Sequence, residues 1–152
     1  MLFIYKINSG LDSEMVFRMD KKVPDRIIKI EADSLDESRE KLFNELDSIE
    51  LGDVSSFEVS LEVIIGFEPA SSRSAAYIDE KQIGECEFIE DDGVWTITHT
   101  GVRPEFGGRG IAGLLVEKVI DEARKRQKKI RPLCSYAAKK MYGKDEYRDV
   151  LE

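Results

Sequence analysis

The sequence is poor in cysteine and histidine, with only Cys86, Cys134 and His99 in 152 residues. A structural zinc site needs more Cys and His ligands than these, so no metal site is expected. Two cysteines this far apart, in a chain with no sign of export, are expected to be reduced thiols rather than a disulfide. The small number of cysteines, both expected to be reduced, predicts a cytoplasmic protein.

Long apolar runs are also missing. No stretch approaches the roughly 18 apolar residues of a membrane helix. The apolar start, residues 1–5, lacks the basic flank and small-residue cleavage site of a signal peptide. It therefore predicts a first strand, and no association with a membrane is expected.

Basic residues are scarce in the first part of the chain. Residues 1–70 carry a net charge of −8, whereas residues 71–152 carry 15 residues of each sign. Nucleic-acid binding needs a cationic surface, so no nucleic-acid partner is expected. The acidic part would favour a basic amine or a basic protein partner.

Hydrophobic patterning predicts mixed structure in the first part. Alternation indicates strands at residues 2–7, 15–19, 26–30 and 57–67. Ser34, followed three residues later by Glu37, predicts a capped helix start, and Gly52 predicts the helix end. One face of this helix is expected to carry the apolar side chains Leu35, Leu42, Phe43, Leu46 and Ile49.

The second part predicts the order β-β-β-α-β-α. Its expected elements are strands at 74–78, 83–89 and 94–100, a helix at 111–126, a strand at 130–134, and short helical segments at 136–142 and 146–151. A Pro- and Ser-containing stretch at residues 68–72 predicts a boundary near residue 70. The fold class expected is α/β (α+β): an acidic α+β region of unknown role at 1–70, followed by a mixed-sheet domain at 71–152.

A glycine-rich turn, Gly107–Gly110, stands between a strand and a long amphipathic helix. Glycines allow a close backbone approach, and the first N–H groups of a helix favour an anion such as pyrophosphate. Gly108, Gly110 and Gly113 formally match the dinucleotide fingerprint, but no acidic residue follows the next strand. The lysine of a P-loop is absent. The alternative to anion binding is that the glycines only form a tight structural turn.

Three sequence motifs, which occur in order along the second part of the chain, resemble motifs of one protein family. Residues 98–112, Thr-His-Thr-Gly-Val-Arg-Pro-Glu-Phe-Gly-Gly-Arg-Gly-Ile-Ala, resemble the coenzyme A-binding motif of the GNAT acetyltransferase superfamily. Pro-Leu-Cys at 132–134 and Glu-Tyr-Arg-Asp at 146–149 resemble a short subfamily that lacks the usual first helices. The resemblance covers residues 73–152. The chain departs from it at Gly107, where Gln or Arg is usual, at Lys140, where tyrosine is expected, and at 144–145, where His-Pro is expected.

The resemblance implies a GNAT-like sheet and transfer of an acetyl group from acetyl-coenzyme A to an unidentified amine, on a small molecule or a protein. The residues it implies for the co-substrate are Thr100, Gly101, Val102, Gly107, Gly108, Arg109, Gly110, Ile111 and Ala112. Gly101 is expected to mark a β-bulge that separates its strand from the next. The alternative is a non-catalytic acyl-coenzyme A-binding or protein-interaction module.

Cys134 and His99 are the candidate catalytic side chains. Cys134 could accept the acyl group, line the pocket, or be an inert apolar residue; a helix starting at Ser135 would lower its pKa. His99 is the natural proton carrier, yet strand alternation predicts that it shares an apolar face with Trp95 and Ile97.

Other polar residues have weaker claims. The candidate acids for the leaving thiolate are Tyr136, Tyr142 and Tyr147, although packing is the commoner role for tyrosine. The basic run 124–131 could meet a 3′-phosphate, but a solvated helix end is the commoner role for such a run.

Overall fold

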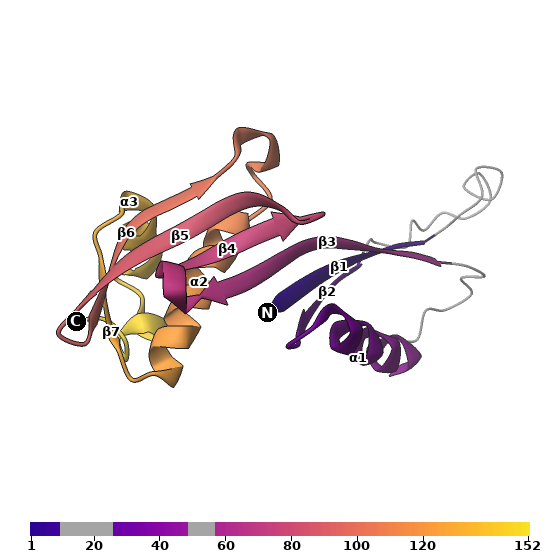
Figure 1. Cartoon of the computed structure of the whole chain (residues 1–152), viewed down its shortest axis with the longest axis horizontal. Coiled ribbons are helices and arrows are strands. Elements are labelled where there is room, and N and C mark those ends of the chain that lie inside the picture. The colour runs from indigo at the N-terminus through magenta and orange to yellow at the C-terminus, as the bar shows by residue number, and fades with distance from the viewer. Residues whose placement is uncertain (10–25, 49–56) are drawn as a thin grey trace. The chain divides into compact units, whose positions relative to one another are not determined.

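The computed structural model describes residues 1–9, 26–48 and 57–152, and it divides the chain into two compact units, Met1–Ile64 and Ile65–Glu152 (Figure 1). Strand β3, Phe57–Glu68, runs through the point of division. The strand expected at 15–19 and the helix end expected at Gly52 lie outside the described residues.

The first unit pairs β1, Leu2–Ser9, with β2, Arg26–Glu31, in an antiparallel register with Leu2 opposite Glu31. Helix α1 covers Leu35–Ser48 and begins with the predicted cap. The Ser34 hydroxyl accepts the Glu37 N–H at 3.2 Å, and the Glu37 carboxylate accepts the Asp33 N–H at 2.8 Å. Both bonds satisfy donors that the helix itself leaves unpaired.

The core of this unit is apolar and consists of Phe3, Tyr5, Ile28, Ile30, Ala32 and Leu42, with Leu35, Leu46 and Ile64 packed against it. The expectation that Phe43 shares this face is wrong, because its side chain is 72% exposed. Phe43 follows Leu42 by one residue, which turns it about 100° away around the helix.

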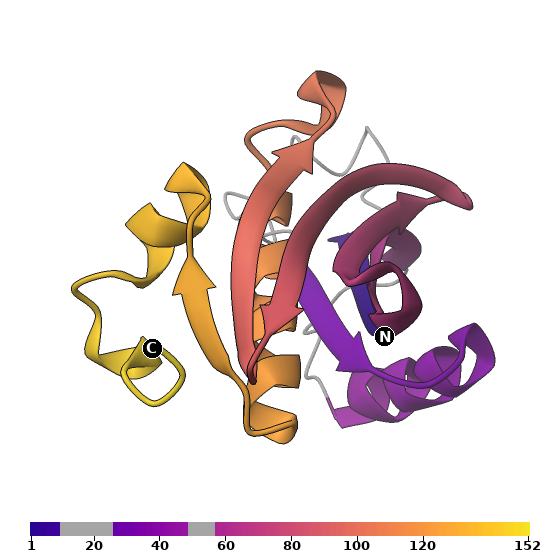
Figure 2. The same ribbon diagram turned by 60° about the vertical axis from the view of Figure 1, so that its left-hand side comes forward.

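The second unit contains an antiparallel meander of β4 (Arg73–Ile78), β5 (Lys81–Asp91) and β6 (Val94–Val102), with β7 (Lys129–Pro132) parallel to β6. Helix α2, Ile111–Lys125, connects β6 to β7 along one face of the sheet (Figure 2). Short 3₁₀ turns at Pro69–Ser71 and Pro104–Phe106 flank the meander, and helix α3, Ser135–Met141, follows β7. The predicted order β-β-β-α-β-α is confirmed.

Two boundaries differ from expectation. The strand expected at 130–134 ends at Pro132, so that Cys134 instead stands at the N-cap of α3. The helix expected at 146–151 is only a 3₁₀ turn, Asp145–Tyr147, after which Leu151 forms a bridge with Ile130. The chain there packs against β7 rather than continuing a helix.

Helix α2 is amphipathic, as expected, and its apolar stripe faces the sheet. Five residues of the stripe are fully buried: Leu115, Val116, Val119, Ile120 and Ala123. The Ser74 hydroxyl of β4 donates to the Leu115 carbonyl at 2.7 Å. A side chain at Gly84 would meet the Gly101 carbonyl oxygen at 2.9 Å and the Leu115 side chain at 3.2 Å. The absence of a side chain at Gly84 therefore lets α2, β5 and β6 approach one another.

A β-bulge interrupts β6. Glu87 of β5 pairs with His99, but the next residue, Phe88, pairs with Ile97, so Thr98 is the extra residue. The bulge expected at Gly101 is therefore misplaced, since Gly101 pairs regularly with Glu85. An extra residue exchanges the two faces of the strand beyond it. The faces of β6 thus differ before and after Thr98.

Candidate functional site

The glycine turn, Gly107–Gly110, has a backbone conformation that favours glycine at two positions. Gly108 and Gly110 have φ values of 74° and 77°, in the left-handed region, and Gly110 caps the start of α2. The turn is exposed. Because the first N–H groups of α2 have no acceptor within the helix, the turn can present several donors to an anion.

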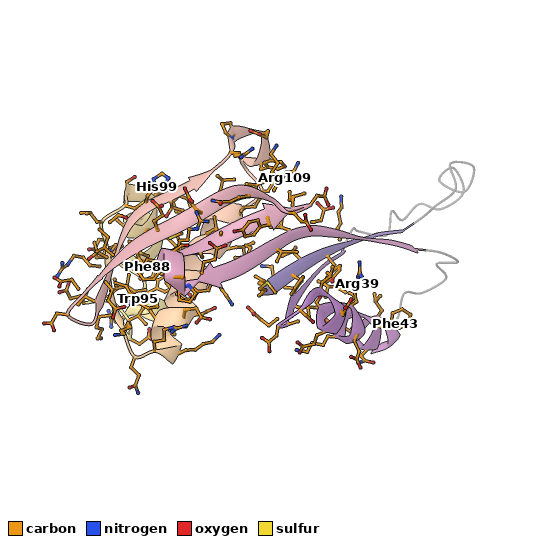
Figure 3. All side chains as sticks on the ribbon, viewed as in Figure 1. Arg39, Phe43, Phe88, Trp95, His99 and Arg109 are labelled. Carbon is orange, nitrogen blue, oxygen red and sulfur yellow. The ribbon has the colours of Figure 1, made fainter. Side chains whose placement is uncertain are left out.

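The side chain of Arg109 extends from this turn and lies over the Phe106 ring, with its guanidinium carbon 5.5 Å from the ring centre. Figure 3 shows Trp95 and Phe88 near the start of β6, and His99 further along the strand toward the turn that carries Arg109. The Arg109 guanidinium can therefore bind an anion at the turn together with the backbone N–H donors.

Strands β6 and β7 separate after a short parallel ladder. Their last pair is Ile97 with Pro132, and the Ile97 carbonyl then accepts the N–H groups of Leu133 at 3.0 Å and Cys134 at 2.9 Å. Within residues 57–152, β6 continues to Val102 with no partner from β7. The gap opens beside residues 98–102, which include the predicted co-substrate residues Thr100, Gly101 and Val102.

Cys134 lies at this gap, partly buried, at the start of α3. Its burial raises the pKa of the thiol, but hydrogen bonds outweigh this effect and leave the pKa below its usual range. The groups that lower the pKa are the Ala137 N–H, the Thr100 hydroxyl, and the N–H groups of Tyr136 and Thr100. A thiolate at the start of a helix is a competent nucleophile.

Cys86 differs sharply from Cys134. It is fully buried, and this burial raises the pKa of its thiol to about 12. The Thr100 hydroxyl lies 3.5 Å from its sulfur. Cys86 is therefore a packing residue, and Thr100 lies next to both thiols.

His99 occupies the other face of β6. The prediction that it shares a face with Trp95 and Ile97 is wrong: those residues are buried, whereas His99 is exposed. The bulge at Thr98 is the reason, because it exchanges the faces beyond it. His99 and Cys134 accordingly lie on opposite sides of the strand, and the structure does not form a Cys–His pair.

A pocket lies beside His99, between β5 and β6. It is lined by Gln82, Ile83, Gly84, Glu85, His99, Gly101, Val102 and Arg103. Glu85 accepts hydrogen bonds from Arg73 and from Gln82, each at 2.8 Å. A side chain at Gly101 would come within 2.8 Å of the His99 Nε2 atom. Glycine at this position therefore leaves space beside the imidazole.

Polar groups of α3 lie against α2. A Cβ added at Gly113 would stand 3.4 Å from the Tyr136 hydroxyl and 3.9 Å from the Lys140 Nζ. Lys140 forms an ion pair with Glu117 at 2.7 Å, and the Tyr147 hydroxyl donates to the same carboxylate at 2.5 Å. Burial and Glu117 raise the pKa of Tyr147, which makes this tyrosine a poor proton donor.

The predicted basic run is largely neutralised by partners. Arg124 pairs with Asp149 at 2.7 Å, Lys128 with Glu90 at 2.6 Å, and Arg131 with Glu152 at 2.5 Å. These pairs support a structural role rather than one toward a phosphate. Among the described residues there is no group of metal-ligating side chains and no helix long and apolar enough to cross a membrane.

A family model described as GCN5-related N-acetyl-transferase matches residues 73–150. The chain belongs to this acetyltransferase family. The match covers the meander, the glycine turn, α2, β7 and α3, the elements that surround the gap. No match was found among curated proteins.

Solved structures similar to this family member include a GCN5-like protein from Staphylococcus aureus, 28% identical over 60% of this chain and 87% of that one, with a TM-score of 0.46. Eis1 from Mycobacterium abscessus is 20% identical over 46% of this chain and 21% of its own, with a TM-score of 0.39. A ribosomal-protein-alanine N-acetyltransferase from Brucella melitensis biovar Abortus 2308 is 20% identical over 46% and 57%, with a TM-score of 0.36.

Two features of the site were missed by sequence reasoning. The Thr100 side chain, not only its backbone, reaches Cys134. The polar network of Glu117, Lys140 and Tyr147 joins residues from three separate elements. The strand alternation of residues 94–100 carried no sign of the bulge that turns Thr100 toward the thiols. The second feature depends on tertiary packing and has no local sequence signal.

Proposed function

We propose that this family member transfers an acetyl group from acetyl-coenzyme A to a primary amine. The observation that carries the proposal is the glycine turn at the start of α2, beside the point where β6 parts from β7. The backbone N–H groups of residues 108–112 suit the pyrophosphate, and Arg109 adds a charge. Beyond Ile97 the edge of β6 has no partner from β7, and the backbone groups of Thr100–Val102 are proposed to face the pantetheine and thioester.

The proposed reaction is acyl transfer. The neutral amine attacks the thioester carbon, a C–N bond forms, the C–S bond breaks, and coenzyme A leaves as a thiol after gaining a proton. The acceptor is proposed to enter from the pocket beside His99, where the exposed imidazole can take the amine proton. The pocket is lined by residues of β5 and β6, whereas the gap lies at the edge of β6 that faces β7, and this supports separate entry of the two substrates.

Cys134 is proposed as a second acyl acceptor. Its thiolate would attack the thioester carbon, the C–S bond to coenzyme A would break, and coenzyme A would leave as a thiolate that takes a proton from solvent. The neutral amine would then attack the Cys134 thioester, form the C–N bond and release the Cys134 thiolate, while the amine proton passes to a base. Partial exposure and a lowered thiol pKa support this route. Direct transfer, with Cys134 lining the site, is the alternative within the same activity.

A titration with acetyl-coenzyme A tests the binding step. Ligand at about 100 times its Kd should stabilise the native protein by about 2.7 kcal/mol, and this should raise its Tm. The control ligand is acetyl-pantetheine, which lacks the pyrophosphate that the turn is proposed to hold and should give a much smaller shift. An unchanged Tm with millimolar acetyl-coenzyme A would overturn the proposal.

Release of coenzyme A with a panel of amines tests transfer, and intact mass tests the acyl-enzyme. An acetyl adduct that forms in the wild type and is lost in Cys134→Ala supports the covalent route. Amine-dependent turnover with Cys134→Ala at the wild-type rate contradicts that route and leaves direct transfer.

The rival function, a non-catalytic acyl-coenzyme A-binding module, is favoured by one observation. Gly107 has an extended backbone and gives the turn no side-chain contact where the family usually has Gln or Arg. Binding without amine-dependent release of coenzyme A would support this module against the transferase.

Residues 1–70 are proposed to have a role separate from that of residues 71–152. Their acidic side chains are proposed to attract a basic acceptor or a basic protein partner in the cytoplasm. Their net charge of −8 supports the idea. The KM of a cationic amine should then rise with ionic strength while that of a neutral isostere stays constant, because salt screens exposed charges. Equal salt dependence of the two would contradict it.

A further inference from the structure

A second pocket lies at the end of α2 that is remote from the glycine turn, and all of its lining residues belong to the second unit. Its volume is about 320 Å³, within the range of sites that hold small ligands. Gly110 and Arg126 cap the two ends of α2, so about 22 Å of helix separates this pocket from the turn. Figure 3 shows the same separation, with Phe88 and Trp95 near the start of β6 and Arg109 on the turn that follows its end. The lining residues are Phe67, Pro69, Ser72, Phe88, Glu90, Trp95, Arg126 and Lys128.

Three aromatic rings form the apolar wall of this aromatic pocket. Trp95 stacks on Phe88 with 4.2 Å between the ring centres. Phe67 stacks on both, at 5.6 Å from Trp95 and 5.9 Å from Phe88, and no two of the ring planes differ by more than 20°. Trp95 and Phe88 are buried, whereas Phe67 is only half-buried. Nearly parallel rings present a flat apolar surface, which suits another planar ring better than a branched group.

A guanidinium lies over this flat surface. The Arg126 guanidinium carbon is 5.2 Å from the centre of the Phe67 ring. The ion-pair partner of Arg126 is Glu122, at 3.4 Å, but Glu122 also pairs with Lys125 at 3.1 Å and with Lys118 at 3.8 Å. Arg126 can therefore turn to a ligand without leaving the Glu122 carboxylate uncompensated. A guanidinium binds a carboxylate through two parallel hydrogen bonds, which also fix the orientation of the ligand.

The ionisable side chains of the aromatic pocket carry a net charge of +1, because Arg126 and Lys128 are cationic and Glu90 alone is anionic. Lys128 pairs with Glu90 at 2.6 Å, which lowers the pKa of the Glu90 carboxyl and keeps it ionised. These two charges largely compensate each other, so the excess positive charge resides on Arg126. It favours an anionic ligand over a cationic one.

The indole N–H of Trp95 is a further polar group of this pocket. The Trp95 side chain is 3% exposed, and among the described residues no acceptor lies within hydrogen-bonding geometry of its Nε1 atom. Glu90 is close enough for this N–H to contribute, after Lys128, to the lowered pKa of its carboxyl. The N–H is therefore directed to the side of the ring where Glu90 borders the pocket. A buried donor without an acceptor is costly, and a ligand oxygen can satisfy it.

We propose that the aromatic pocket binds a small planar aromatic carboxylate. The ring of the ligand lies against Phe67 and Trp95, its carboxylate pairs with Arg126, and the Trp95 N–H donates to a ligand oxygen. This site is independent of the proposed acetyl transfer, because none of its lining residues belongs to the glycine turn, the gap or the pocket beside His99. Binding can therefore be tested without acetyl-coenzyme A and without any measure of activity.

Trp95 is the single tryptophan, so its fluorescence and its one indole N–H signal in NMR report directly on this pocket. The probe is benzoate, titrated into the full chain at constant pH and ionic strength. We expect a saturable change in the fluorescence with a Kd of about 0.1–1 mM, as suits a ligand of this size, and a downfield shift of the indole proton.

Three control ligands separate the contributions of the ring and the charge. Cyclohexanecarboxylate keeps the charge without the flat ring, benzyl alcohol keeps the ring without the charge, and benzylamine reverses the charge. Each should bind at least about threefold more weakly than benzoate, because each lacks either the stacking surface or the charge-assisted hydrogen bonds.

Arg126→Gln and Lys125→Gln are the matched variants, because both remove one positive charge from the end of α2 but only Arg126 lines the pocket. Arg126→Gln should weaken benzoate binding about tenfold or more, whereas Lys125→Gln should bind it like the wild type. Urea unfolding of each variant establishes that it is folded in the titration, and the ligand series needs the wild type alone if Arg126→Gln is unstable. The proposal would be overturned by no saturable response to benzoate, by equal binding of benzyl alcohol, by tighter binding of benzylamine, or by equal losses in the two variants.

Discussion

Replacing Gly110 with alanine tests the conformation on which the anion-binding turn depends. Gly110 has a φ of 77° and stands at the N-cap of α2, and a Cβ added there would have no atom within 4 Å. A new methyl group would therefore meet no neighbour. Any loss of stability must come from the backbone conformation alone. Gly107→Ala is the matched comparison, because Gly107 lies in the same turn with an ordinary φ of −62°.

The expected size follows from two opposing effects. A left-handed conformation costs an L-residue about 1–2 kcal/mol. Alanine also restricts the unfolded chain, which favours folding by about 0.4–1 kcal/mol at a compatible site. The net loss for Gly110→Ala should therefore lie between about 0 and 1.6 kcal/mol, with a midpoint of about 0.8 kcal/mol. Gly107→Ala gains the same entropy without the strain, although its Cβ would lie 3.2 Å from the Pro104 carbonyl oxygen, so it should stay near the wild type.

The assay is urea unfolding followed by the fluorescence of Trp95, which is the single tryptophan and lies in the same unit as the turn. The unfolding midpoint of Gly110→Ala should fall below that of Gly107→Ala, by a shift equal to the lost free energy divided by the slope m. Its affinity for acetyl-coenzyme A should also fall, because the N–H donors are displaced. Equal midpoints for the two variants would refute a left-handed residue at 110.

Three further predictions concern other parts of the chain. Iodoacetamide at neutral pH should label Cys134 and leave Cys86 unlabelled, as peptide mass mapping would show; labelling of both would contradict the burial of Cys86. Because the pKa of Cys134 is lowered in the folded state, its contribution to stability is present above the pKa of the unfolded thiol and is lost as the pH falls through the folded pKa. The stability difference between the wild type and Cys134→Ser should therefore be larger at pH 9.5 than at pH 6, measured by urea unfolding, and a constant difference would count against it. Gly84→Ala should lower the free energy of unfolding by about 1–3 kcal/mol, because the new methyl group overpacks against the Gly101 carbonyl and Leu115. Gly93→Ala would place a methyl group with no atom within 4 Å, so only backbone strain should destabilise it. Urea unfolding of both variants would compare the two losses.

Elements with strong local signals could be predicted from the sequence. The capping box at Ser34, the apolar stripe of α2 and the meander of β4 to β6 all depend on residues close together in the chain, and all three are confirmed. The helix expected at 146–151 failed for a different reason. The chain there is held by contacts with α2 and β7, such as Arg124 with Asp149, which no local pattern reveals.

The site was predictable only in its backbone part. The glycine turn follows from local sequence, and Gly108 and Gly110 stand in the left-handed region that glycine readily adopts. The faces of β6 could not be predicted, because strict alternation assumes a regular ladder. One extra residue at Thr98 exposes His99 and turns Thr100 toward the thiols, and a bulge in a strand has no reliable sequence signature unless a glycine marks it.

That extra residue in β6 has a consequence for how the protein can change over time. Because of it, the two faces of β6 carry different candidate groups. One face has Thr100 next to Cys134, and the other has His99 next to the pocket. Substitutions on one side need not disturb the other, so the preference for an acceptor can alter while the surroundings of the thiol stay intact. A deletion of Thr98 would instead interchange the two sides at once, and no single substitution could have that effect.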